Sequence, residues 1–506
     1  VRNLTITGEL DAATLDISGA IDVAGTTNLD VVDIDGAVDM ASTLAVAGVL
    51  TGASLDISGD VDVDGTTETD VLTINGSQLN YKAFGTSSIM FGDTTTGTIS
   101  GANYNTGIGI DVFAALTTGD ENIALGYSAL NDLTTGSSNT AMGSTAGTKI
   151  TTGDFNVALG ADSLKNTTTA SNNTAVGTNA LTANTTGATN VAVGTSAMIS
   201  NTTGGNNVAV GVNAFDANTT GDENTAIGDG ALGANTTADR NVAVGARTLL
   251  INTTGASNVA VGYEALEVNT TASNNTAVGF QSLTANTTGA SNTAVGRHSM
   301  LTNTTGASNV ATGLNSLYYN TTGDFNVALG VQALTTNTTA DNNTAVGYQS
   351  LLSNSTGADN TAIGSGALDA NTTGANNTAM GKNALGANTT ASNNTAFGYG
   401  AMLVNTTGNS CIAIGGDTLD ANTTGDNNIA IGQAALGANT TAASNTAIGY
   451  TSMQQNTTGT QNTALGSGSL NANTTASSNT AVGFNSLLSN TTGAENVAVG
   501  YQSLNA

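Results

Sequence analysis

Three aspartates at alternating positions are the first residues of this sequence that could bind a ligand. Asp60, Asp62 and Asp64 lie in the segment DVDVDG at 60–65, which matches the start of a calcium-binding loop. A loop of that type also needs a bidentate Glu at its twelfth position, and that position is Val71. Alternating Asp and Val is equally typical of a strand with one wet face. We therefore interpret the segment as a solvated strand and keep a loose cation site as the alternative.

Residues that commonly perform catalysis are scarce. The chain has one His, His298, and one Cys, Cys411. Neither has a partner of the right type in the sequence, so neither predicts a catalytic triad or a metal site. The sequence therefore predicts no enzyme activity and no cofactor.

The elements that would position any site are organised by a repeat of seventeen residues. Glycines recur at 109, 126, 143 and onward in steps of seventeen to 500, and none of these 24 positions carries another residue. With this glycine as position 5, the unit reads Asn, Thr/Val, Ala, Val/Ile, Gly, x, x, Ala/Ser, Leu, x, x, Asn, Thr, Thr, Gly/Ala, x, x. The repeat predicts an array over 105–506, with 23 full copies and a partial one.

The repeat unit predicts an all-β fold, a parallel β-solenoid. It is too short for the helical repeat families, and Asn-Thr-Thr-Gly interrupts helices. Seventeen residues suit one coil of two or three short strands, with equivalent positions stacked about 4.8 Å apart. Asn over Asn and Thr over Thr would then form ladders of hydrogen bonds. Twenty-four such coils would make a rod of roughly 115 Å.

The positions of the unit predict which side chains are buried. Positions 2 and 4 share one face of a strand, Ala at position 3 faces the other way, and Leu at position 9 begins a second buried ridge. Because one coil buries few large apolar side chains against a high entropic cost, we favour an intertwined homotrimer with its Ala face inside.

The two glycine positions of the unit predict different backbones. The invariant glycine at position 5 implies positive φ or a contact too close for a Cβ, so Gly262→Val should damage the fold. Position 15 is Gly in most copies and Ala in seven, so we expect ordinary φ there and little effect of Gly255→Ala.

Position 12 changes character along the array. The first three copies carry Leu116, Leu133 and Ile150. Thr167 follows, and Asn occupies the position from Asn184 onward. We expect the three apolar side chains to be buried, either under the segment 82–104 with its Phe84, Met90 and Phe91 or because the rod is wider at its base. Asn201, Asn218 and their successors should stay exposed.

Several polar and aromatic positions of the array could face a ligand. Tyr263, Tyr348, Tyr399 and Tyr450 at position 6 could stack on sugar rings, or each could cover the glycine of a neighbouring coil. Asn-x-Thr/Ser occurs at 19 consecutive corners from Asn184 to Asn490, as glycosylation acceptors or as turn-capping residues. The rows of Thr at positions 13 and 14 suggest ice binding as a function. Adjacent Thr side chains should point in different directions, however, which leaves only one row on a given face.

The N-terminal part has a different composition. GAIDVAGTT at 19–27, GAVDMASTL at 36–44 and GDVDVDGTT at 59–67 are copies of one unit, and fourteen of the 36 acidic residues lie before residue 82. We interpret 1–81 as an acidic β-repeat shaft and 82–104 as a junction to the array.

The stacked motifs NVAVG and NTAIG resemble the head repeats of YadA-like trimeric autotransporter adhesins, in which each repeat is one turn of a left-handed β-roll. The longer unit with NTTG looks still more like arrays in tail-fibre-type proteins of phages and environmental bacteria, and LDISGDVDVDGTT is similar to shaft segments of phage tail fibres. The resemblance implies a structural fibre, on a virion or a cell surface. The end at Ala506, inside a repeat, indicates a truncated or cleaved chain whose missing tip would bind a host receptor or glycan.

Charge and hydropathy exclude some partners. A net charge of −28 disfavours nucleic acid and anionic lipid, and no apolar stretch is long enough for membrane insertion. The competing function is a binding module whose ligand, glycan or ice, lies along the side of the rod.

Overall fold

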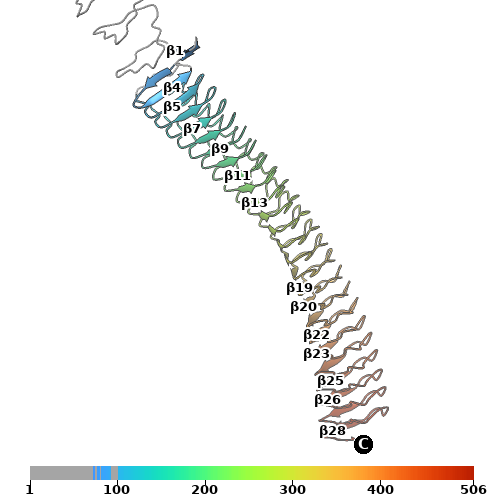
Figure 1. The fold of residues 1–506 in the computed structure, drawn as a ribbon. Coiled ribbons are helices and arrows are strands. Elements are labelled where there is room, and N and C mark those ends of the chain that lie inside the picture. Colours follow the sequence, from blue (N-terminus) through green and yellow to red (C-terminus); the bar gives the residue numbers. More distant parts are fainter. Residues whose placement is uncertain (1–71, 75–76, 80, 93–100, 506) are drawn as a thin grey trace, which may run out of the picture. The chain divides into compact units, whose positions relative to one another are not determined.

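The computed structural model describes residues 72–74, 77–79, 81–92 and 101–505, all within the compact unit Val71–Ala506. Every regular element in these residues is a β-strand, and none of them lies in a helix. The array is a parallel β-solenoid with one coil per seventeen residues (Figure 1), which confirms the predicted fold class. Most of the predicted acidic shaft, with Asp60, Asp62 and Asp64, lies outside the described residues.

Two short antiparallel pairs precede the array in the chain, and only the second belongs to the sheet of the solenoid. Strand β1 (Leu72–Ile74) pairs with β2 (Ser77–Leu79), and β3 (Tyr81–Phe84) pairs with β4 (Ser88–Gly92). Strand β4 then pairs in parallel with β5 (Thr106–Gly109), the first strand of the array.

From β6 onward every strand has three residues and pairs in parallel with the equivalent strand of the next coil, as Val259 does with Thr276. These strands are β6 (Ile123–Leu125), β7 (Thr140–Met142), β8 (Val157–Leu159), β9 (Thr174–Val176), β10 (Val191–Val193), β11 (Val208–Val210), β12 (Thr225–Ile227), β13 (Val242–Val244), β14 (Val259–Val261), β15 (Thr276–Val278), β16 (Thr293–Val295), β17 (Val310–Thr312), β18 (Val327–Leu329), β19 (Thr344–Val346), β20 (Thr361–Ile363), β21 (Thr378–Met380), β22 (Thr395–Phe397), β23 (Ile412–Ile414), β24 (Ile429–Ile431), β25 (Thr446–Ile448), β26 (Thr463–Leu465), β27 (Thr480–Val482) and β28 (Val497–Val499).

Each described coil of the array has one strand, so the prediction of two or three strands per coil is wrong. In the coil that begins at Asn258, three residues besides glycine have positive φ: Glu264 at 55°, Leu266 at 51° and Asn274 at 62°. Left-handed residues at positions 7 and 9 curl the chain instead of extending it. The curled segment still joins the stack, because the Leu266 N–H donates to the Ser282 carbonyl one coil on (3.0 Å).

The interior of each coil is narrow and is filled by the chain itself. Ala260 at position 3 and Leu266 at position 9 are both fully buried. Leu at position 9 therefore forms the predicted buried ridge. Because Ala260 already lies inside its own coil, the prediction of an Ala face between chains is wrong. The outer face of each strand instead carries positions 2 and 4, such as the half-buried Val259 and Val261.

Two ladders of asparagine run through the interior, at positions 1 and 12. At position 1, Asn258 Nδ2 donates to the Ala272 carbonyl (2.9 Å), and the Asn258 N–H donates to Asn241 Oδ1 (3.0 Å). At position 12, Asn269 Nδ2 donates to the same Ala272 carbonyl (3.0 Å) and to Asn252 Oδ1 (2.8 Å). Both amides thus close the coil on the carbonyl of position 15 and tie it to the preceding coil.

The prediction that Asn201, Asn218 and their successors stay exposed is wrong. Both side chains are fully buried, as are the others at position 12 up to Asn473. Asn218 Nδ2 donates to Asn201 Oδ1 (2.7 Å) and to the Gly221 carbonyl (3.1 Å), so the amide is satisfied without water. The Asn-x-Thr corners from Asn184 to Asn473 are therefore capped and stacked, and their Nδ2 atoms are inaccessible to a glycosylating enzyme in the folded array, whereas Asn490 in the last full coil is partly exposed.

Leu116, Leu133 and Ile150 are buried, as predicted. Position 12 points inward along the whole described array, so these residues need no special widening of the rod. Met90 and Phe113 belong to the same buried apolar cluster, and Phe84 is also buried while Phe91 is half-buried. Met90 lies opposite Gly107 in the register, and a Cβ on Gly107 would be 3.2 Å from the Met90 side chain. The hairpin β3–β4 therefore caps the apolar start of the array.

At position 12, Thr167 lies between the three apolar residues of the first coils and the asparagine ladder that starts at Asn184. It is fully buried at position 12, and its Oγ1 accepts a hydrogen bond from Asn184 Nδ2 (3.2 Å). A threonine can accept this bond with its hydroxyl and still offer a methyl group to apolar neighbours. It therefore supplies the acceptor that the first asparagine of the ladder needs.

The glycine at position 5 satisfies both of its predicted requirements. Its φ lies between 126° and 142° in all 24 copies. A Cβ on Gly262 would also lie 2.5 Å from the carbonyl oxygen of Gly279 in the next coil. Backbones of successive coils thus touch at this column, and a side chain there meets both strain and collision.

Position 15 has ordinary φ, as predicted, but the structure gives a reason to expect a larger effect of Gly255→Ala than the sequence indicated. Gly255 is absent from the positive-φ glycines, yet its Cβ would collide with the carbonyl oxygen of Ala272. Each of the seven native Ala copies has Gly at this position in both adjacent coils, whereas Gly255 lies between Ala238 and Ala272. The native copies show that the array accommodates Ala at position 15 when both neighbouring coils have Gly there. No two neighbouring coils of the native array both have Ala at this position.

A Cβ on Gly306 would also lie 2.5 Å from the next carbonyl oxygen, that of Gly323, but both adjacent coils carry Gly at position 15, as they do around every native Ala copy. We therefore expect Gly306→Ala to change the free energy of unfolding by less than about 0.5 kcal/mol. Gly255→Ala should cost about 1–3 kcal/mol, since three consecutive coils would then have to shift apart. Thermal melting of the two variants side by side measures the difference. Equal melting temperatures would show that adjacent Ala residues fit as well as isolated ones.

Candidate functional site

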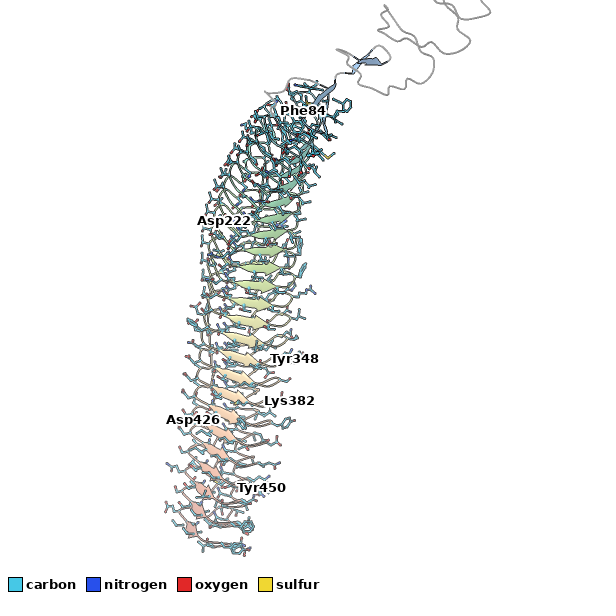
Figure 2. The ribbon with its side chains drawn as sticks, turned by 90° about the vertical axis from the view of Figure 1, so that its left-hand side faces the viewer. Phe84, Asp222, Tyr348, Lys382, Asp426 and Tyr450 are labelled. Carbon is cyan, nitrogen blue, oxygen red and sulfur yellow. The ribbon has the colours of Figure 1, made fainter. Side chains whose placement is uncertain are left out.

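Different types of side chain project from different sides of the array. Figure 2 shows Tyr348, Lys382 and Tyr450 projecting from one side of the ribbon and Asp222 and Asp426 from the opposite side. The first three are residues at position 6, next to the outer strand face, and the two aspartates are residues at position 16. Because every coil repeats the same path, a residue's position in the unit decides which side it occupies.

The four tyrosines predicted as ligand-binding candidates are all exposed. Tyr263 is 44% exposed, Tyr348 53%, Tyr399 60% and Tyr450 59%. They lie on one column but are separated by several coils, so the structure does not bring them together. Tyr263 stacks on Phe280 with ring centroids 5.6 Å apart, and no other ring pair in the described residues includes one of these four tyrosines.

A cluster of rings in the middle of the array was missed by the sequence analysis. From Phe280 it continues to His298 (centroids 5.6 Å apart), Tyr318 (6.1 Å further) and Tyr319 (4.5 Å further). We call these four residues with Tyr263 the aromatic patch. The Arg297 guanidinium lies 5.8 Å from the Phe280 ring centre. The patch joins positions 6, 7, 10 and 11 of different coils, so a search within one position could not reveal it.

An ion-pair network borders the aromatic patch. Arg247 pairs with Glu264 at 3.5 Å and with Glu267. Gln281 Nε2 donates to Glu264 Oε2 (2.8 Å), and this bond, with one from Tyr263, holds the pKa of Glu264 below its ordinary value. These groups are at the surface, so their contribution to stability is small.

Three aspartates at position 10 lie over glycines of the next coil. Asp216, Asp369 and Asp420 each have a glycine seventeen residues on, and each Oδ1 would be 3.5 Å from a Cβ on that glycine. The glycine therefore makes room for the carboxylate. Burial raises the pKa of all three carboxyl groups above the ordinary value.

We expect the array to become more stable as the pH falls from 7 toward about 4. A carboxyl whose pKa is higher in the folded than in the unfolded chain binds its proton more tightly when folded. Its stabilising effect is present at low pH and is lost as the pH rises through the folded pKa. Asp162, whose pKa is lowered by Lys165, and Glu264, whose pKa is lowered by Gln281 and Tyr263, act in the opposite direction. Melting temperatures across this range measure the sum.

A triple variant, Asp216→Asn, Asp369→Asn and Asp420→Asn, isolates these half-buried carboxyls in that experiment. It should melt at a higher temperature than the unmodified chain at pH 7 and should gain less on acidification. An unchanged pH profile in the variant would assign the effect to other groups.

Cys411 lies in the interior of the coil and His298 on its outside. Cys411 occupies position 1 of the asparagine ladder, is fully buried, and burial raises the pKa of its thiol to about 11. Such a thiol is unreactive in the folded chain. His298 lies in the aromatic patch. Within the described residues no three His, Cys, Asp or Glu side chains gather as a metal site, and the aspartates at 60, 62 and 64 lie outside them.

The two threonine columns diverge, as predicted. Thr253 Oγ1 at position 13 donates to the Thr270 carbonyl one coil on (2.9 Å), whereas position 14 is exposed in every described copy. A single exposed Thr rank therefore runs along the rod.

No family model matches the chain, and no curated protein matches its sequence. Among the described residues there is no helix that could cross a membrane. The class that the observations define is a β-solenoid repeat protein.

Proposed function

We propose that the chain is a structural fibre protein, of a phage tail or a cell-surface stalk, that spans distance and supports attachment to a host surface. The observation that carries the proposal is that almost every interior group serves the stacking of one coil on the next. The glycine column is continuous through the array, and buried side chains at positions 1, 3, 9 and 12, mostly Asn, Ala, Leu and Asn, stack along it. Such a column adds length with each repeat.

The outer strand face supports assembly into a homotrimer. Positions 2 and 4 carry no charged residue in any of the 24 copies, although the chain has a net charge of −28. Several of these side chains are well exposed, among them Ile227 (39%), Leu329 (38%) and Phe397 (52%). A continuous uncharged face of this kind is typical of a protein–protein interface. Copies would associate side by side through this face, because both edges of each internal strand already pair with the chain's own coils.

The mass of the particle in solution tests the proposed assembly. Light scattering on the purified chain should give three times the chain mass, and negative-stain electron microscopy should show a rod whose array measures roughly 115 Å. Val261→Lys with Val278→Lys, on the outer face, should reduce the mass to that of one chain. Thr254→Lys with Thr271→Lys, at the exposed position 14, is the matched control and should leave it unchanged. A monomer at all concentrations, or a globular particle, would contradict the proposal.

The exposed threonine rank favours ice as an alternative ligand of the rod. Position 14 is Thr in all 23 full copies and is exposed in each, so its hydroxyls form one regular row. An ice-recrystallisation assay on the full chain separates this function from a purely structural one. Inhibition that Thr254→Lys with Thr271→Lys weakens would favour ice binding.

A further inference from the structure

We propose that the side of the array beside Tyr318 and Tyr319 is a saccharide-binding site. A hollow of about 320 Å³ lies there, lined by His298, Asn315, Tyr318, Tyr319, Gln332 and Thr335. This volume is at the lower end of those that hold small ligands, which suits one or two sugar units. The site is independent of the fibre role, because it needs one chain and none of the outer strand face.

The two tyrosines that form one wall are not explained by the repeat. No other copy has an aromatic residue at position 10 or 11, and Tyr319 is 51% exposed. An exposed ring contributes little to the stability of the coil, so packing does not account for the pair. Tyr318 and Tyr319 meet edge to face with centroids 4.5 Å apart, which fixes the orientation of both rings.

The other groups around the hollow are neutral hydrogen-bonding groups. Gln332 Oε1 accepts a hydrogen bond from Gln349 Nε2 (2.9 Å). The Nε2 group of Gln332 can therefore donate a hydrogen bond to a ligand. Thr335 Oγ1 donates to the Asn315 carbonyl (3.1 Å) and retains its capacity to accept. Asn315 Oδ1 is buried without a hydrogen-bond partner. A buried acceptor of this kind is costly unless a donor reaches it.

Rings beside amides, a hydroxyl and an imidazole suit a sugar better than other ligands. The apolar face of a pyranose packs on aromatic rings, while its hydroxyl groups both donate and accept hydrogen bonds. A lipid would leave the amides unpaired, and the net charge of −28 opposes a nucleic acid. The rings of the patch also repeat along the rod at about the rise of one coil, close to the length of one pyranose unit. A linear oligosaccharide could therefore extend from the hollow toward Phe280 and Tyr263.

Screening the full chain on a printed glycan array tests the proposal. The printed glycans should include neutral hexose and N-acetylhexosamine oligosaccharides and acidic oligosaccharides that contain uronic acid, sialic acid or sulfate. We expect binding to at least one class. Neutral saccharides would contact the hollow alone, whereas acidic saccharides would also contact the Arg297 guanidinium beside Phe280. Arg297→Ala would then lower the affinity for the acidic saccharides. Absence of binding to every printed saccharide would overturn the proposal.

Variants locate the binding on the rod. Tyr319→Ala should lower the affinity for the saccharide at least about tenfold, and Gln332→Ala alone should lower it by a similar factor. Tyr399→Ala removes another exposed ring (60% against 51% for Tyr319) at position 6, far along the chain from the hollow, and is the matched control. All three should keep the melting temperature of the unmodified chain. Equal loss in Tyr319→Ala and Tyr399→Ala, or no loss in either hollow variant, would place the binding elsewhere.

Discussion

Gly262→Val is expected to break the array at one coil and to cost about 3–5 kcal/mol of the free energy of unfolding. Gly262 has a φ of 128°, which a β-branched residue adopts only under strain. Its Cβ would also lie 2.5 Å from the Gly279 carbonyl oxygen, so the next coil must move as well. Since each coil contacts mainly its two neighbours, a broken coil divides the stack into two parts.

Thermal melting followed by far-UV circular dichroism, with limited proteolysis, measures this effect. We expect a lower first transition and a new cleavage site near residue 262. Val261→Thr is the matched control, because position 4 is already Thr at Thr312 in a neighbouring part of the array. The control should melt like the unmodified chain and resist cleavage. If Gly262→Val behaved like the control, the backbone contact at position 5 would not limit the stack.

The period, the glycine column and the Leu ridge could be predicted because in-register stacking copies the sequence period directly into the structure. Every residue of a coil meets its own equivalent seventeen residues on, as Ala260 meets Ala277. An invariant glycine in such a stack therefore reports a constraint that recurs in every coil. The same logic predicted the Asn and Thr ladders, which the hydrogen bonds confirm.

Which face of the strand lies inside the coil, and that position 12 points inward, could not be predicted, for two physical reasons. Alternation along a strand separates Ala260 from Val259 and Val261 but does not show which face is inside. The narrow coil decides it, since Leu266 already fills the space opposite and leaves room for a methyl group. Asparagine at position 12 was assigned to the surface by its polarity. Identical amides in adjacent coils satisfy one another, so burial costs them no hydrogen bonds.

The number of strands and the aromatic patch could not be predicted because they depend on backbone turns. Leu266 and its equivalents have positive φ, which nothing in a leucine indicates. The turn places positions 7, 10 and 11 on one corner, and only then do His298 and Tyr318 become neighbours. Comparing residues twenty apart, in addition to those seventeen apart, would have revealed this pair.

Cys411 offers a reciprocal test of the ladder that holds the coils together. An asparagine at position 1 makes several bonds, as Asn258 does: its Oδ1 accepts from the Asn275 N–H (2.9 Å) and its Nδ2 donates to the Ala272 carbonyl (2.9 Å). At Cys411 the corresponding N–H, that of Asn428, reaches only the sulfur at 3.5 Å. A thiol is a weak acceptor and a weak donor, so the ladder is weakest at this coil.

Asn258→Cys should therefore cost about 2–3 kcal/mol, because it leaves buried amide and carbonyl groups poorly bonded, whereas Cys411→Asn should stabilise the array by about 1 kcal/mol. The two changes exchange the same side chains in opposite directions at the same position of the coil, so differences in side-chain size cancel in the comparison. Denaturant titration of both variants measures the free energies of unfolding. Loss of stability in both would mean that the coil around Cys411 has adapted to sulfur. A gain in Cys411→Asn alone would show that the asparagine ladder, rather than the local packing of each coil, sets the strength of the stack.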